Sequence, residues 1–505
     1  MINVLEGRDV AIFDIPGAYL HAEMPKDKIV LMKFRGQFAD IMCEVDPKHK
    51  ENIVFEKGKK VLYVQVVRAI YGCIESTMLW YNLYVDTLKE LGFELNPYDR
   101  CVANKIVNGS QCTMAWYVDD NKLSHKDPKV VDSILKEMTD RFGELTTTQG
   151  DEHVFLGMKL KLNKKEKSYA VNMSNQIEET VQAFGEKIDG TVSTPAAKYL
   201  FNVPDNDEEL DEERKERFHS VVAKLLYIMK RARPDLETAV AFLCTRVSSC
   251  GLSDWKKLRR LLQYAKNTSS DERVIGASSI NDIYMFVDAS YAVYNNMRGV
   301  TGGCMSMGRG FFHARSSKQK INTKRSTETE LVGVSEYVPF NIWAVNFLHE
   351  QGYDMNKNIL YQDNQGAMLT EKNGRNSCTG NSRHINIRYF FVKDRIDKNE
   401  LSVEYCPTEL MVADYFTKPL QGSLFKTLRR VIMGHDTLHN ILSDISMKER
   451  VGNRNVSEGE HVADNKLIEK SNNDVQAHRA MKCAQATNGQ KQKQKKVTWK
   501  DIVSK

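Results

Sequence analysis

The sequence AWYVDD at residues 115–120 decides the fold of the first half of the chain. An apolar run there ends in two adjacent carboxylates, Asp119 and Asp120, and the polar residues Asn121 and Lys122 follow. This pattern predicts a strand, a tight turn and a returning strand, with both aspartates at the tip. Adjacent carboxylates repel each other and are costly to bury unless a cation neutralises them, so we predict a Mg²⁺ or Mn²⁺ site here. A solvated turn is the alternative, because Asp is common in turns.

The composition is that of a soluble protein with ordinary hydrophobic cores. The 505 residues are 41% hydrophobic and 27% charged, and at about 150 residues per domain they make about three domains. No apolar run reaches the ~18 residues of a membrane span, and the ten cysteines are scattered without the spacing of a zinc site. The net charge of +6 permits a nucleic-acid partner without requiring one. We therefore expect an intracellular protein with reduced thiols and no membrane partner.

A third aspartate stands at the end of another apolar strand. Residues 9–15 read DVAIFDI, and Asp14 is followed by a Pro-Gly break. Asp14 is a candidate third metal ligand, with a strand-end or capping role as the alternative. Two amphipathic helices are predicted nearby, one from Ser76, as its N-cap, to about Leu91 and one over residues 128–142.

Carboxylates also end or begin the predicted elements of the C-terminal part. A strand from residue 282 ends at Asp288, and another from residue 359 ends at Asp363. Between them a helix begins at Ser326 or Thr327, with two acids in its first turn, Glu328 and Glu330. A short helix over residues 409–417 carries Asp414.

Four motifs in the first 160 residues resemble the reverse transcriptase of copia-type LTR retrotransposons. They are FDIPGAYL at 13–20, AIYG at 69–72 with Trp80 after it, YVDD at 117–120 and FLG at 155–157. The resemblance implies a polymerase palm and thumb that bind an RNA template, a DNA primer and deoxynucleoside triphosphates.

The resemblance also implies roles for single residues. Asp14, Asp119 and Asp120 would hold two Mg²⁺ ions, one activating the primer 3′-hydroxyl and one holding the incoming triphosphate. Tyr19 would pack under the nucleotide sugar and exclude a ribose 2′-hydroxyl, with a core tyrosine as the alternative. The turn that grips the primer strand would be Phe155, Leu156 and Gly157.

The chain departs from the family pattern in two places. Glu75 stands where the family usually has Gln, and Ser76 replaces the Pro that usually follows. A carboxylate near an incoming triphosphate is unfavourable unless it points away. Only 13 residues precede Asp14, whereas the family's fingers lie upstream and supply cations for the triphosphate. We therefore expect a truncated chain that lacks most of the fingers and extends a primer poorly.

The C-terminal part resembles the ribonuclease H domain of the same elements. The matching strings are VDA at 287–289, STETE at 326–330, DNQGA at 363–367, RHINIRY at 383–389 and ADYFTKPL at 413–420. This likeness implies a two-metal site that cuts the RNA of an RNA–DNA hybrid. The implied metal ligands are Asp288, Glu328, Asp363 and Asp414. Glu330 competes with Glu328 for this role, with a helix-start acid as its alternative, and His384 is placed beside the cleaved strand.

The predicted fold class is α/β (α+β), with a right-hand polymerase palm and thumb, a helical connection and a ribonuclease H-like mixed sheet with helices. The predicted domains are 1–190 (palm and thumb), 191–279 (connection), 280–434 (ribonuclease H-like) and 435–505 (disordered basic tail). A helix in the connection carries a basic cluster that either faces solvent or contacts the hybrid backbone, namely Lys256, Lys257, Arg259 and Arg260.

The predicted function is RNA-directed DNA synthesis with ribonuclease H activity, in the cytoplasm within a particle or in the nucleus. The alternative is a polymerase-dead remnant of an element that only binds nucleic acid or retains only hybrid nuclease activity.

Overall fold

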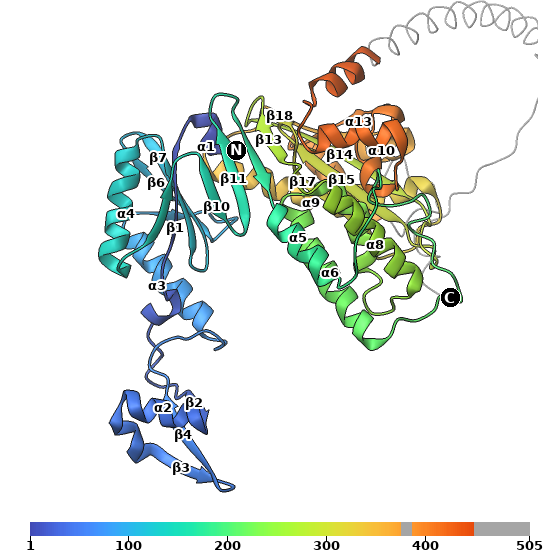
Figure 1. Cartoon of the computed structure of the whole chain (residues 1–505). Coiled ribbons are helices and arrows are strands. Elements are labelled where there is room, and N and C mark those ends of the chain that lie inside the picture. The colour runs from blue at the N-terminus through green and yellow to red at the C-terminus, as the bar shows by residue number, and fades with distance from the viewer. Residues whose placement is uncertain (375–385, 449–505) are drawn as a thin grey trace, which may run out of the picture. The chain divides into compact units, whose positions relative to one another are not determined.

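The computed structural model describes residues 1–374 and 386–448. It is a mixed α/β structure with four β-sheets, which confirms the predicted fold class (Figure 1). Residues 1–441 form one compact unit, and a second begins at Leu442. The predicted start of the disordered tail at residue 435 is wrong, because the compact unit runs to Ile441 and Leu438 is buried. From residue 449 onward the predicted tail lies outside the described residues. Within the described ranges, no helix combines the length and the apolar composition that crossing a membrane requires.

The first sheet carries the aspartate pair. Its six strands have the order β5-β6-β7-β8-β1-β9, and every neighbouring pair is antiparallel. The strands are β1 (Asp9–Asp14), β5 (Glu94–Leu95), β6 (Val102–Val107), β7 (Ser110–Tyr117), β8 (Asp120–His125) and β9 (Thr146–Gln149). Helices α3 (Ser76–Glu90) and α4 (Pro128–Phe142) pack against it, and their apolar faces share one core with the sheet.

A small second sheet is inserted between the 3₁₀ helix η1 (Ala18–His21) and α3. Its strands are β2 (Leu31–Arg35), β3 (Ile53–Glu56) and β4 (Lys59–Gln65), in the order β2-β4-β3. Helix α2 (Gln37–Val45) and the 3₁₀ helix η2 (Pro47–Asn52) accompany it. A separate core of Ala39, Cys43 and Leu62 holds these elements together.

The third sheet joins segments that are far apart in the sequence. Its order is β10-β11-β12-β13-β16, with β10 (Glu152–Phe155), β11 (Met158–Asn163), β12 (Ser168–Asn172), β13 (Arg273–Ala277) and β16 (Gly308–Arg309). A helical block lies between β12 and β13 in the sequence. It comprises α5 (Ser174–Ala183), α6 (Glu212–Arg231), η3 (Pro234–Leu236), α7 (Glu237–Cys244) and α8 (Leu252–Asn267).

The fourth sheet carries the C-terminal aspartates and has the order β17-β15-β14-β18-β19. The pairs β14–β18 and β18–β19 are parallel and the others antiparallel. Its strands are β14 (Asp282–Ser290), β15 (Val300–Ser306), β17 (Phe311–Lys318), β18 (Lys357–Gln362) and β19 (Ser402–Tyr405). The helices are α9 (Ser326–Glu350), α10 (Gln365–Asn373), α11 (Asn386–Asp397), α12 (Asp414–Thr417) and α13 (Gly422–Ile432).

Helix α9 approaches this sheet closely at Gly333. A Cβ atom at that position would lie 3.1 Å from the Cβ atom of Ala289 on β14. Glycine therefore lets the helix backbone come near the strand, one residue beyond Asp288. Val334 and Tyr337 on the same helix are buried in the core that α9 shares with β14 and β15.

Two predicted helix caps are wrong. The N-cap of α3 is Glu75, and Ser76 instead donates a 2.7 Å hydrogen bond to the carbonyl of Ile70 and accepts one from its N–H. The N-cap of α9 is Arg325, without a side-chain capping bond. In both cases the hydroxyl residue is already inside the first turn, so it cannot cap it.

Candidate active sites

Strand pairing brings two of the three N-terminal aspartates together. Asp14, the last residue of β1, lies opposite Asp120, the first residue of β8. Tyr117 and Asp120 close the β7–β8 hairpin, so Val118 and Asp119 form its two-residue turn. Val118 has a φ of 60°, which is an outlier for a β-branched residue. Such strain persists only where surrounding contacts over-determine it, and it is typical of functional sites.

Side chains from the α3 region hold this turn in place. The indole Nε1 of Trp80 donates a 2.8 Å hydrogen bond to the carbonyl of Val118. The hydroxyl of Tyr71 donates a 3.2 Å hydrogen bond to Oδ2 of Asp119. These two hydrogen bonds hold both the strained backbone of the turn and the carboxylate of Asp119 in place.

The three carboxylates affect one another's protonation. Burial raises the pKa of Asp14, and the charges of Asp119 and Asp120 raise it further. Burial and then Asp119 raise the pKa of Asp120. The oxygens of these three aspartates do not all lie within 4.8 Å of one another. Among the described residues, one other group of acidic side chains meets this distance criterion. Because the turn is held in place and its carboxylates repel one another, a bound cation would stabilise this arrangement.

Tyr19 lies beside this turn and is buried, with 9% of its surface exposed. Its hydroxyl is 3.2 Å from Oγ1 of Thr77, and its ring centroid is 4.5 Å from that of Tyr71. Tyr71 in turn binds Asp119. Tyr19 is therefore part of the packing that surrounds the aspartates, and its role in sugar selection stays a prediction.

Glu75, the departure from the family pattern, has a charge partner. Nζ of Lys28 lies 2.6 Å from its Oε1, and this hydrogen bond lowers the pKa of Glu75. The side chain of Lys28 is exposed and that of Glu75 is partly buried. The pair places a cation beside the carboxylate, which reduces its repulsion of an anionic nucleotide.

The FLG motif forms the tight turn between β10 and β11. Phe155 pairs with Met158, and Leu156 and Gly157 both have positive φ, at 50° and 70°, as a two-residue type I′ hairpin turn requires. The hydroxyl of Tyr227 donates to the carbonyl of Leu156 at 2.7 Å. Nε2 of Gln176 donates to the carbonyl of Gly157 at 2.8 Å. Helices α5 and α6 therefore hold the turn.

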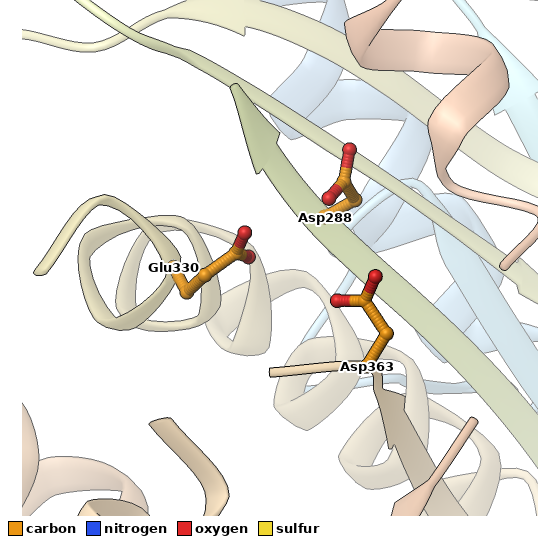
Figure 2. Close-up of side chains that lie close together, drawn as sticks. All are labelled: Asp288, Glu330 and Asp363. Carbon is orange, nitrogen blue, oxygen red and sulfur yellow. The ribbon is translucent and has the colours of Figure 1, made fainter. Parts of the chain in front are cut away.

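The C-terminal carboxylates form a compact cluster. One ligand oxygen from each of Asp288, Glu330 and Asp363 lies within 4.8 Å of the others. Asp288 comes from β14, Glu330 from α9 and Asp363 from the residue after β18. Figure 2 shows the three carboxylates directed toward one shared space.

This cluster fits a hard divalent cation. Glu330 is 4% exposed, and its Oε2 has no hydrogen-bond partner. Burial, followed by the charges of Asp288 and Asp363, raises the pKa of Glu330 well above its ordinary value. Burial and then Asp288 also raise the pKa of Asp363. An all-oxygen donor set with an unsatisfied buried oxygen is what Mg²⁺ or Mn²⁺ prefers.

The structure brings Glu330, and not the predicted Glu328, into this cluster. Glu328 lies outside the cluster, and its Oε2 accepts a 2.8 Å hydrogen bond from the N–H of Lys324. It therefore closes the loop before α9, whereas Glu330 faces the aspartates. The predicted His384 lies outside the described residues.

Asp414 lies next to the cluster and is paired with a lysine. Nζ of Lys418 is 2.7 Å from Oδ1 of Asp414 and 3.7 Å from Oδ2 of Asp288. Burial and then Asp288 raise the pKa of Asp414 to about 7, although Lys418 opposes this. Thr417 donates a hydrogen bond to Asp288, and Thr408 donates one of 3.1 Å to Asp363.

Sequence reasoning missed Lys418, Thr417 and Thr408. The four-residue spacing of Asp414 and Lys418 is one helical turn, which is a signal for such a pair. The contact of Thr408 with Asp363 joins residues 45 positions apart, and nothing local indicates it.

The basic cluster on α8 mostly binds the chain's own loop. Lys257 donates to the carbonyl of Asn202 at 2.6 Å, and Arg259 pairs with Glu186 at 2.9 Å. Arg260 donates to Oγ1 of Thr194 at 2.9 Å. Lys256 is exposed, and nucleic-acid contact by this cluster stays a prediction.

Comparisons with known proteins agree with the motifs. Residues 1–198 match the family model described as reverse transcriptase (RNA-dependent DNA polymerase). The chain is 25% identical over 384 residues to the retrovirus-related Pol polyprotein from transposon TNT 1-94 of Nicotiana tabacum, covering 75% of this chain and 28% of that protein. It is 24% identical over 387 residues to the corresponding polyprotein from transposon RE2 of Arabidopsis thaliana, covering 75% and 25%.

A more distant relative spans more of the chain. The transposon Ty1-GR2 Gag-Pol polyprotein of Saccharomyces cerevisiae is 23% identical over 438 residues, covering 82% of this chain and 23% of that protein. The chain therefore spans about a quarter of the length of these relatives.

Among solved structures, the prototype foamy virus protease-reverse transcriptase aligns with 82% of this chain and 45% of its own, at 13% identity. The TM-score of 0.21 is too low to place the elements of the two chains in correspondence. The sequence matches confirm the predicted resemblance: the chain contains, over residues 1–198, a reverse transcriptase domain of the kind found in the Pol polyproteins of copia-type retrotransposons.

Proposed function

We propose that this chain copies RNA into DNA and also cuts the RNA strand of RNA–DNA hybrids, using Mg²⁺ or Mn²⁺ at both sites. Its proposed partners are an RNA template, a DNA primer, the hybrid they form and deoxynucleoside triphosphates. The observation that carries the nuclease half is the buried cluster of Asp288, Glu330 and Asp363 with the unpartnered Oε2 of Glu330.

The nuclease residues have distinct tasks in this proposal. Asp288, Glu330, Asp363 and Asp414 would hold the ions, which when bound polarise the phosphodiester and stabilise the attacking and leaving oxygens. Thr408 fixes Asp363 by donating to its Oδ2. The sheet order, with β17-β15-β14 antiparallel and β14-β18-β19 parallel, supports a ribonuclease H-like domain. Contacts with 2′-hydroxyls would give the preference for a hybrid.

The polymerase residues surround the β7–β8 turn. Asp14, Asp119 and Asp120 would hold ions beside the primer 3′-hydroxyl and the triphosphate. Tyr19 would lie under the sugar, which its packing against Tyr71 supports. The β10–β11 turn would support the primer strand, and its anchoring by two helices makes it rigid enough to do so.

The experiment is a cleavage assay with the full chain on an RNA–DNA hybrid whose RNA strand is labelled at one end. The expected result is cutting that needs Mg²⁺ or Mn²⁺, with little action on single-stranded RNA or on duplex DNA of the same sequence. Asp363→Asn should nearly silence it while leaving the circular dichroism spectrum unchanged. Full activity of that variant, or equal cutting of single-stranded RNA, would refute the proposed nuclease.

A second candidate function is hybrid cleavage without DNA synthesis. One observation favours it: the nuclease carboxylates gather within 4.8 Å, whereas the polymerase aspartates do not. Primer extension on an RNA template, measured on the same preparation, separates the two. Extension that Asp119→Asn abolishes supports both activities, and hybrid cleavage without extension supports the nuclease alone.

A further inference from the structure

Lys418 projects into the acidic cluster of the fourth sheet. Its Nζ is 2.7 Å from Oδ1 of Asp414 and 3.7 Å from Oδ2 of Asp288. Asp288 is 3% exposed and Asp414 is 8% exposed, so both carboxylates are taken out of water. Two buried carboxylates need a compensating cation, and the ammonium group of Lys418 supplies it from within the chain.

The two sides of Asp288 are therefore unequal. On one side are Glu330 and Asp363, and no cation is 4.0 Å or closer to either carboxylate among the described residues. Oε2 of Glu330 there has no hydrogen-bond partner. On the other side, Lys418 is paired with Asp414, and the hydroxyl of Thr417 donates a hydrogen bond to Asp288. The side of Glu330 and Asp363 therefore lacks a cation, whereas the side of Asp414 has the ammonium group of Lys418.

We propose that Lys418 occupies the place of the second cation when the nuclease site is empty, so that the two ion positions differ in affinity. The first ion enters between Asp288, Glu330 and Asp363. The second ion reaches Asp288 and Asp414 only when the lysine side chain leaves. This inference rests on the proposed nuclease function and assigns to Lys418 a positioning and gating role at that site.

Lys418 is placed so that it can leave. Its side chain is 42% exposed, and its charge can reach water without crossing the protein interior. Its backbone stays fixed as the C-cap of α12, because its N–H donates a 2.9 Å hydrogen bond to the carbonyl of Asp414, the first residue of that helix. A lysine ammonium on a flexible stem is suited to such an exchange, since it binds as a point charge and not through a rigid fork.

The test measures Mn²⁺ binding by calorimetry and by electron paramagnetic resonance, in the full chain with Asp119→Asn and Asp120→Asn so that the polymerase aspartates contribute less. The parent protein should bind one ion tightly and a second more weakly. Lys418→Met should tighten the second ion by roughly 10- to 100-fold and leave the first nearly unchanged. Lys418→Arg, which keeps the positive charge, should keep the second ion weak. Equal second-ion affinity in the parent and in Lys418→Met would overturn the inference.

Thermal unfolding gives an independent reading without catalysis. In a metal chelator, Lys418→Met should lower the melting temperature, because Asp288 and Asp414 then repel each other without compensation. Added Mn²⁺ should restore the melting temperature of Lys418→Met more than it raises that of the parent. A variant that loses no stability in the chelator would contradict the proposed charge compensation.

The two proposals fail separately. If the ion affinities shift as expected but the chain does not cut hybrids, the nuclease function is wrong and the role of Lys418 stands. If the chain cuts hybrids but Lys418→Met binds both ions as the parent does, the role of Lys418 is wrong and the nuclease stands.

Discussion

The indole of Trp80 donates a 2.8 Å hydrogen bond to the carbonyl of Val118, the residue with positive φ in the aspartate turn. Trp80→Phe removes that donor and leaves a carbonyl unpaired, which costs about 1–3 kcal/mol. We expect primer extension to fall by about tenfold or more, because the strained turn that carries Asp119 relaxes. Trp116→Phe, in the same core, is the matched control and should reduce extension less. Similar extension rates for the parent and Trp80→Phe would show that the turn does not depend on this bond.

Sugar selection tests the position of Tyr19. Tyr19→Val removes the ring that packs against Tyr71 and should raise ribonucleotide incorporation relative to deoxyribonucleotide incorporation by about 10- to 100-fold. Tyr19→Phe keeps the ring and loses only the contact with Thr77, so it should keep the preference. The measurement is the ratio of kcat/KM for the two sugars in primer extension. Equal losses for both sugars in Tyr19→Val would make Tyr19 a core residue only.

A buried ion network should stabilise the helical block. Asp235 has a fully buried side chain that binds Arg233 through both oxygens at 2.8 Å, and Arg429 on α13 reaches it at 3.0 Å. Burial alone would raise the pKa of Asp235, but Arg233 and then Arg429 hold it well below its usual range. Asp235→Asn should lower the free energy of unfolding in urea by about 3–5 kcal/mol.

The control for this network is an exposed ion pair in the same region. Arg430 and Asp436 are bound at 2.7 Å with side chains 56% and 42% exposed. Asp436→Asn should cost only ~0–1 kcal/mol in the same urea experiment. Equal effects of the two Asp→Asn changes would mean that the buried network contributes no more than a surface pair.

Stability should depend on pH through His313. Its Nδ1 is 2.7 Å from the hydroxyl of Tyr337, and burial, with Lys230 and Arg315 nearby, lowers its pKa to about 4 from an ordinary 6.5. Between these values the unfolded chain binds a proton that the folded chain does not, so this contribution to stability is present above pH 6.5 and is lost toward pH 4.

The variant His313→Gln isolates this contribution. The difference in unfolding free energy between parent and variant should change by on the order of 2 kcal/mol from pH 6.5 to pH 4, after allowance for partial exposure of the ring. Taking the difference removes the titration of other groups such as Asp414, whose raised pKa acts in the opposite direction. A difference that is constant over this range would exclude His313 as the source.

The aspartates at strand ends could be predicted from the sequence because their signals are local. An apolar run that stops at a carboxylate indicates a strand that ends there, and this holds for Asp14 and Asp363. The predicted strand end at Asp288 is wrong, because β14 continues to Ser290 and Asp288 is buried. The helix α4 (Pro128–Phe142) was also predicted with its observed limits, since a proline opens it and its apolar residues repeat at helical spacing.

Which glutamate reaches the site, Glu328 or Glu330, depends on which face α9 turns toward the sheet. The sequence alone does not give that orientation. Glu330 lies one turn before Gly333 and Val334, which face β14, so it points at Asp288. The interior glycine was a usable signal for close approach of the helix to the strand. By contrast, the contact of Lys28 with Glu75 spans 47 positions, and only the folded chain brings them together.

The most direct test compares Glu330→Gln with Glu328→Gln in the full chain, by hybrid cleavage and by Mn²⁺ binding. Both changes remove one negative charge from the N-terminal part of the same helix and keep the side-chain length. Glu330→Gln should reduce cleavage by about 100-fold or more and weaken the first ion, because its carboxylate belongs to the cluster. Glu328→Gln should reduce cleavage far less, because Glu328 accepts the N–H of Lys324 outside the cluster. A Glu330→Gln variant that cuts hybrids and binds Mn²⁺ like the parent, while Glu328→Gln does neither, would contradict the assignment of this site.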